Sequence, residues 1–63
     1  MMQEIRDILE ASQNGKKGII LYFKGQNIGG MVVHISDEAV EIRSREYSRI
    51  VVRIEAIDAV AMS

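Results

Sequence analysis

Few residues of this 63-residue chain have types and spacing that could support chemistry. The acidic pair Asp37-Glu38 could contact a divalent cation, but acidic residues are also ordinary constituents of turns. His34 is the single histidine, it alternates with apolar residues and the chain has no cysteine, which indicates a structural role rather than a zinc site. The sequence contains no nucleophile–base pair, metal-ligand cluster or phosphate-binding loop. We therefore expect no catalysis, no cofactor and no bound metal.

The charged residues occur in blocks along the chain. Eight lysines and arginines face nine acidic residues, giving a net charge of −1 and no overall attraction to nucleic acid. Arg43, Arg45 and Arg49 could form a local basic patch. Alternatively, they could pair with Glu41 and Glu46 across neighbouring strands.

The length of the chain limits how it can be stabilised. A domain of this size buries only about 60% of its unfolded surface, and disulfides are excluded because cysteine is absent. Hydrophobic residues make up 48% of the chain, which favours stabilisation by oligomerisation. No apolar run approaches the roughly 20 residues of a membrane span, and no signal peptide is recognisable, so we expect a cytoplasmic protein without membrane contact.

A short amphipathic helix is predicted over about residues 2–12. Ile5, Ile8 and Leu9 form one apolar stripe at helical spacing. Asn14-Gly15 is the expected stop signal, with the glycine at or just past the C-cap of the helix. A helix of this length is marginal alone and needs a surface to pack against.

Five short strands with closely spaced turns are predicted after the helix. Gly29-Gly30 interrupts the second strand, where a chain that bends around a small core has no room for side chains. This pattern predicts a mainly β fold, a strongly bent five-stranded antiparallel barrel with an N-terminal helix, in a single domain spanning 1–63. A single helical turn is expected at 54–56. The expected strands span about 18–24, 26–35, 39–44, 48–53 and 57–62, and Val40 and Ile42 of the third strand are expected to point inward.

Two properties of these strands indicate contact with other surfaces. The first strand is apolar on both faces, with Leu21 and Phe23 on one side and Ile20 and Tyr22 on the other. We expect the barrel interior to cover one face and the helix or a neighbouring subunit the other. The fourth and fifth strands are apolar and lack proline, so their exposed edges favour pairing with another chain.

The order of these elements and several residues resemble the Sm-like family, which includes the Hfq-type bacterial RNA chaperones. The likeness covers nearly the whole chain and lies closest to the divergent cyanobacterial Hfq-like proteins. It implies an SH3-like bent barrel, and a homo-oligomeric ring closed by pairing the fourth strand of one protomer with the fifth of the next. The matching segments are the Lys24-Gly25 turn, the bend at Gly30, the loop 36–40 (SDEAV) and the segment 52–57 (VRIEAI).

The same resemblance implies where single-stranded RNA would bind. At the family's base-reading positions this chain has Ser36, Glu38 and Val40, of which valine cannot hydrogen-bond a base and glutamate offers no stacking platform. Arg53 is the only cation in the second motif, and Glu55 opposes it. The RNA-contacting residues implied are Arg53, Asp37, Glu38 and Gln3 at the pore, and Lys24, Gln26 and Asn27 on the opposite face.

Three functions follow as hypotheses. In the first, the ring binds single-stranded RNA weakly at its pore, as a chaperone or RNA-metabolism factor, because each weak contact is repeated around the ring. In the second, the ring has lost base recognition and is a protein-interaction scaffold. In the third, the chain is a monomeric SH3-like adaptor.

Overall fold

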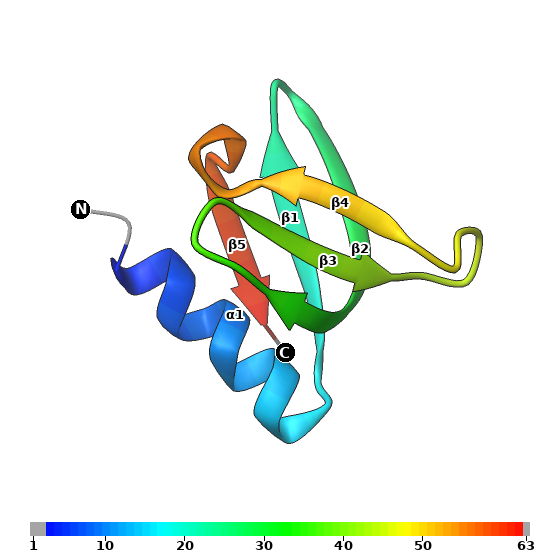
Figure 1. Cartoon of the computed structure of the whole chain (residues 1–63). Coiled ribbons are helices and arrows are strands. Elements are labelled where there is room, and N and C mark those ends of the chain that lie inside the picture. The colour runs from blue at the N-terminus through cyan, green and yellow to red at the C-terminus, as the bar shows by residue number, and fades with distance from the viewer. Residues whose placement is uncertain (1–2, 63) are drawn as a thin grey trace.

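The computed structural model describes residues 3–62, which form an N-terminal helix packed on one five-stranded antiparallel sheet (Figure 1). The mainly β class and the order of the elements are therefore as predicted. Residue 2, the expected first residue of the helix, lies outside the described residues. The elements are α1 (Gln3–Gly15), β1 (Gly18–Phe23), β2 (Gln26–Ile35), β3 (Ala39–Arg43), β4 (Ile50–Arg53), the 3₁₀ turn η1 (Ile54–Ala56) and β5 (Ala59–Met62).

Helix α1 is held on the sheet by its apolar stripe. Ile5, Ile8 and Leu9 join the core, and Leu9 is fully buried. Burial of one leucine side chain contributes about 2 kcal/mol, which stabilises a helix too short to persist alone. Within residues 3–62, no helix combines the length and the apolar character needed to cross a membrane.

The helix ends at Gly15, beyond the expected residue 12. Lys16 has a φ of 55°, in the left-handed region. The Lys17 N–H then donates to the Ser12 carbonyl oxygen at 3.1 Å, the bond that closes a Schellman motif. Gly15 is the last residue of the helix, where the prediction placed the stop, and the left-handed conformation falls one residue later, at Lys16.

The sheet is open. Its strand order is β4-β3-β2-β1-β5, so β4 and β5 lie at opposite edges and do not pair with each other in the described chain. The predicted closed barrel is therefore wrong for the single chain. After η1 the chain pairs with β1 and not with β4, and closure would require the missing β4–β5 hydrogen bonds.

The bend in the sheet depends on Gly30 and on a bulge in β2. The β2–β3 register shifts between Val32 and His34, and a bulged strand bends and twists more strongly. At Gly30, a Cβ atom would lie 2.6 Å from the carbonyl oxygen of Arg43. At Gly29, its nearest neighbour would be the Ile19 carbonyl oxygen at 3.7 Å, an ordinary contact. Of the glycine pair, only Gly30 is required by the close approach of two strands.

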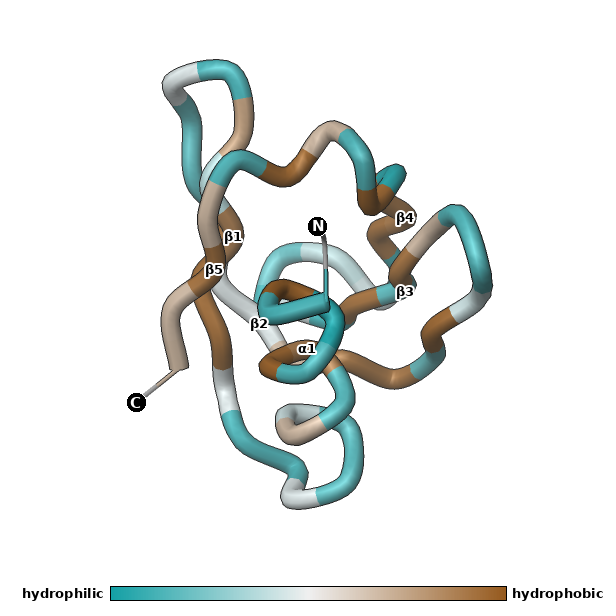
Figure 2. Tube along the Cα trace, turned by 90° about the vertical axis from the view of Figure 1, so that its left-hand side faces the viewer, coloured by the Kyte–Doolittle hydropathy of each residue, from teal (hydrophilic) through white to brown (hydrophobic). Residues whose placement is uncertain are grey.

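The core lies on one side of the bent sheet, and α1 covers that side. In Figure 2, α1 lies in front of the sheet, with β1 and β5 on one side of it and β3 and β4 on the other. The predicted inward positions Val40 and Ile42 are fully buried. The nine buried apolar residues of this core are Leu9, Ile19, Leu21, Val32, Val40, Ile42, Val52, Ile54 and Ile57.

The opposite face of β1 is not covered by residues 3–62. Ile20 and Tyr22 are 41% and 40% exposed. The helix packs on the same side as Ile19 and Leu21, so the expectation that it would cover the second face of β1 was wrong.

The strands are shorter than expected at several ends. β4 begins at Ile50 instead of residue 48, because the Ser44 Oγ accepts from the N–H groups of Glu46 and Tyr47 and directs the chain out of the ladder. β5 begins at Ala59 instead of residue 57, because the Ile57 N–H donates to the Ile54 carbonyl oxygen and caps η1. β1 ends at Phe23 and β3 at Arg43, each one residue early.

Candidate functional site

Three of the predicted RNA-contacting residues, Arg53, Asp37 and Glu38, lie together around a polar depression of about 590 Å³, named here the Arg53 pocket. Asp37 and Glu38 come from the β2–β3 loop, and Arg53 is the last residue of β4. The pocket therefore joins the two segments that carry the Sm-like resemblance. Its remaining lining residues are Arg6, Ile54 and Glu55.

Arg6 is a member of this pocket that sequence reasoning missed. One guanidinium nitrogen donates to the carbonyl oxygens of Ser36 and Asp37, both at 3.0 Å. The loop is also held by its own bonds, with the Ala39 N–H donating to the Ser36 Oγ and the Ile54 N–H donating to the Glu38 carbonyl oxygen. Arg6 thereby ties α1 to the β2–β3 loop, and carbonyl oxygens satisfy part of its hydrogen-bonding capacity.

Arg53 is not a free cation in this arrangement. Its guanidinium forms a hydrogen-bonded ion pair with Glu55, the carboxylate expected to oppose it. The two side chains are 75% and 71% exposed, so water screens the pair and it adds little to stability.

The balance of charge in the Arg53 pocket is unfavourable for a phosphate. Asp37, Glu38 and Glu55 supply three carboxylates against the two guanidinium groups of Arg6 and Arg53, giving a net charge of −1. Within residues 3–62, no group of three or more His, Cys, Asp or Glu side chains is arranged to hold a metal ion. The pocket therefore suits a partner that supplies hydrogen-bond donors or positive charge.

The family's base-reading positions are engaged in the fold itself. Val40 is fully buried in the core and cannot reach a ligand. The Ser36 hydroxyl donates to the Ala39 carbonyl oxygen and accepts from the Ala39 N–H, which uses its hydrogen-bonding capacity inside the turn. Glu38 is exposed, but its carboxylate repels a phosphate backbone.

The other predicted residues do not join this pocket. The Gln3 amide donates to the Asp7 carboxylate on the same helix at 2.7 Å, and Gln3 is not among the lining residues. Lys24 and Gln26 lie at the exposed β1–β2 turn, where Lys24 and the following glycine both have positive φ, as in a type I′ hairpin. Asn27, close by on β2, lines a second cavity.

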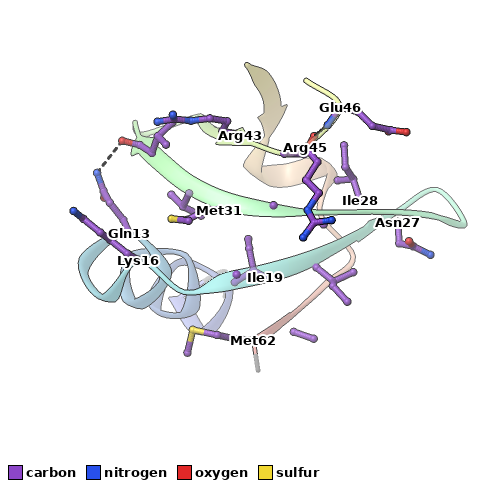
Figure 3. A pocket seen from close by; sticks show the side chains of 18 residues that line it. Gln13, Lys16, Ile19, Asn27, Ile28, Met31, Arg43, Arg45, Glu46 and Met62 are labelled. Carbon is purple, nitrogen blue, oxygen red and sulfur yellow. Dashed lines mark hydrogen bonds between the residues drawn. The ribbon is translucent and has the colours of Figure 1, made fainter. Parts of the chain in front are cut away.

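The second cavity, named here the β1–β2 groove, has a volume of about 1340 Å³ and follows the exposed face of β1 and β2 (Figure 3). Figure 3 shows the Arg45 side chain extending from the β3–β4 loop toward these two strands. The residues that define the groove are the glycines Gly18, Gly29 and Gly30, the apolar Ile20, Met31 and Met62, and the charged Lys16, Arg43, Arg45 and Glu46.

Sequence reasoning did not identify this groove, although two of its signals were present. The apolar outer face of β1 and the run of arginines were both noted, but they are separated along the chain by more than a complete strand. Of the three arginines, only Arg49 forms an ion pair within residues 3–62, with Glu41 at 3.4 Å. Strand pairing then brings Arg43 beside Met31 of β2, so the basic and apolar features meet at one surface.

Comparison with known proteins adds no family to this description. No protein-family model matches the chain, and no curated protein matches it. The likeness to the Sm-like family rests on the order of the elements and on the residues themselves.

Proposed function

We propose that this chain is an Sm-like, ring-forming protein and that the ring is a protein-interaction scaffold. The observation that carries the ring is the open sheet, which ends in β4 on one side and β5 on the other. Both edge strands have four residues, so each is long enough to pair completely with the other. Pairing β4 of one protomer with β5 of the next is a heterologous contact, and repetition of such a contact forms a ring when the rotation between protomers closes.

Exposed apolar side chains at both edges support this assembly. Val51 on β4 is 57% exposed and Met62 on β5 is 37% exposed. Burial of such side chains between protomers stabilises a domain whose own core holds few residues. Backbone N–H and C=O groups on the outer side of each edge strand would gain the partners that they lack in the single chain.

The scaffold function is favoured over RNA binding by the Arg53 pocket. Its net charge is −1, Arg53 is paired with Glu55, and Val40 is buried at a base-reading position. A ring repeats these features in every protomer, so it also multiplies a repulsion of phosphate. Asp37 and Glu38, which are exposed on the β2–β3 loop, are better suited to contact a cationic or hydrogen-bond-donating protein surface.

Weak RNA binding at the pore is the second candidate, because the Arg53 side chain is 75% exposed and can leave Glu55 to contact a phosphate. Titration of labelled oligo-U and oligo-A at low and moderate salt distinguishes the two functions. The scaffold predicts no saturable binding of either RNA. Saturable binding that Arg53→Ala removes would instead establish the pore as an RNA site.

Light scattering at micromolar concentration tests the ring. We expect a mass of several protomers, and we expect Val51→Lys to lower it, because a lysine on an edge strand opposes pairing. Tyr47→Lys is the matched control, since Tyr47 is exposed to the same degree but lies in the β3–β4 loop. A monomeric wild-type protein would contradict the ring and favour the monomeric adaptor.

A further inference from the structure

We propose that the β1–β2 groove is the docking site for a protein partner, and that the partner inserts a segment carrying both acidic and apolar side chains. This inference names the partner chemistry for the proposed scaffold and in that sense rests on it. The groove is chemically distinct from the Arg53 pocket, since it combines an apolar floor with a basic rim.

The floor of the groove is apolar and accessible. Ile20 and Met31 are 41% and 39% exposed, and both line it. Gly18 and Gly29 carry no side chains themselves, so a partner can approach the backbone closely at these two positions. Methionine is unbranched and adapts to the shape of an apolar side chain placed against it.

The rim of the groove determines the charge of the partner. Lys16, Arg43 and Arg45 stand against the single carboxylate of Glu46, a local charge of +2 in a chain whose net charge is −1. Within residues 3–62, neither Arg43 nor Arg45 forms an ion pair, and both are exposed. Their guanidinium groups are therefore available to bind carboxylates of a partner.

A protein segment fits this surface better than RNA does. None of the groove-lining residues is aromatic, so the groove offers no platform on which a base could stack. Its exposed apolar floor would remain in contact with water beneath a sugar–phosphate backbone, whereas leucine or valine side chains would cover it.

The groove stays accessible in the proposed ring. Pairing of a neighbouring β4 with β5 extends the sheet at its edge and leaves the face of β1 and β2 uncovered. Ala61 and Met62, which lie on β5 at the margin of the groove, are the lining residues that belong to that edge strand.

Fluorescence anisotropy with two synthetic peptides tests the docking site on the full chain. The probe is a labelled peptide of alternating leucine and glutamate, and its control alternates leucine and lysine. We expect saturable binding of the acidic peptide, weakened by moderate salt, and no binding of the basic one. Binding of both peptides alike, or of neither at millimolar protein, would overturn the proposal.

Two double variants with the same change in net charge locate the site. Arg43→Ala with Arg45→Ala removes two of the three groove cations and should weaken binding of the acidic peptide about tenfold. Lys17→Ala with Arg49→Ala removes two exposed cations outside the groove and should leave the affinity within about twofold. Equal weakening by both pairs would show general electrostatic attraction and overturn the proposal.

Two further substitutions, Gly29→Val and Met31→Ala, test whether the shape of the β1–β2 groove determines binding. A Cβ at Gly29 makes only ordinary contacts, at 3.7 Å and 3.9 Å, so the fold accommodates a side chain that narrows the groove. Met31→Ala removes part of the floor at an exposed position and keeps the protein folded. Both variants should lower the affinity for the acidic peptide, and their circular dichroism spectra should match that of the wild-type protein. Full affinity in folded Met31→Ala protein would contradict the proposed floor.

These outcomes separate the groove from the ring. If the protein is monomeric and binds the peptide through the groove, the result would support the docking site and contradict the ring. A ring that binds oligo-U or oligo-A through Arg43 and Arg45, in preference to the acidic peptide, would overturn the docking site and leave the ring intact.

Discussion

The backbones of Gly30 on β2 and Arg43 on β3 approach so closely that a Cβ atom on Gly30 would lie 2.6 Å from the Arg43 carbonyl oxygen. Cβ atoms essentially never lie that close to another heavy atom. The neighbouring atom is a backbone oxygen, which cannot move away as a flexible side chain could. The contact occurs at the end of the β2–β3 ladder, next to the Met31–Arg43 pair. One glycine therefore sets the curvature of the sheet on which the Arg53 pocket and the β1–β2 groove both depend.

Replacement of Gly30 with alanine should destabilise the protein, whereas the same change at Gly29 should not. The Gly30→Ala clash forces β2 and β3 apart, and overpacking of this kind costs about 1–3 kcal/mol. Gly29→Ala makes ordinary contacts and restricts the unfolded chain, with an expected effect between neutral and about 1 kcal/mol of stabilisation. Urea denaturation of the two variants measures the difference. Equal midpoints would contradict this account of the bend.

Arg6→Ala should loosen the β2–β3 loop. The substitution removes the bonds to the carbonyl oxygens of Ser36 and Asp37, and because these groups are exposed we expect a loss of only about 1 kcal/mol. Hydrogen exchange should accelerate at the loop amides and in the first turns of α1. Gln3→Ala is the control, because Gln3 bonds within the helix only. Unchanged exchange in Arg6→Ala would show that the loop does not need this arginine.

Ser12→Ala should destabilise the folded protein although it removes only one non-hydrogen atom. Ser12 is fully buried, and its hydroxyl donates to the Lys17 carbonyl oxygen at 2.5 Å and accepts from the Val32 N–H at 3.4 Å. Alanine leaves both backbone groups without this partner, at an expected cost of about 1–3 kcal/mol. Ser48→Ala, at an exposed loop position, is the matched control and should leave the thermal midpoint unchanged. A midpoint shift common to both variants would exclude the buried bonds as its cause.

Lys24→Asn should stabilise the β1–β2 hairpin. Lys24 has a φ of 53° and precedes Gly25 with a φ of 74°, the positions of a type I′ turn for which Asn-Gly is the preferred pair. Asparagine tolerates the left-handed region better than lysine does, so we expect a gain of about 0.5–1 kcal/mol. Lys17 does not have a positive φ, so Lys17→Asn is the control when the thermal midpoints are compared. A loss of stability in Lys24→Asn would contradict the assigned turn.

The amino-acid sequence by itself determined the local elements. The spacing of Ile5, Ile8 and Leu9 predicted α1, and the alternation around Val40 and Ile42 predicted which face of β3 is buried. These features follow from contacts between residues close in the chain, whose geometry is set by the 3.6-residue and two-residue periods. The meeting of Arg53 with Asp37 and Glu38 was also anticipated, through the resemblance to a known order of elements.

Only the tertiary structure decided how distant segments meet. Arg6 reaches Ser36 and Asp37 across 30 and 31 residues, and no local pattern marks that partnership. The sheet is open because β5 pairs with β1 rather than with β4. Both pairings would join segments far apart in the chain, so the local sequence does not decide between them. The β1–β2 groove likewise exists because strand register places Arg43 beside Met31. Register and strand order depend on packing of the whole chain, and hydrophobic periodicity alone does not specify them.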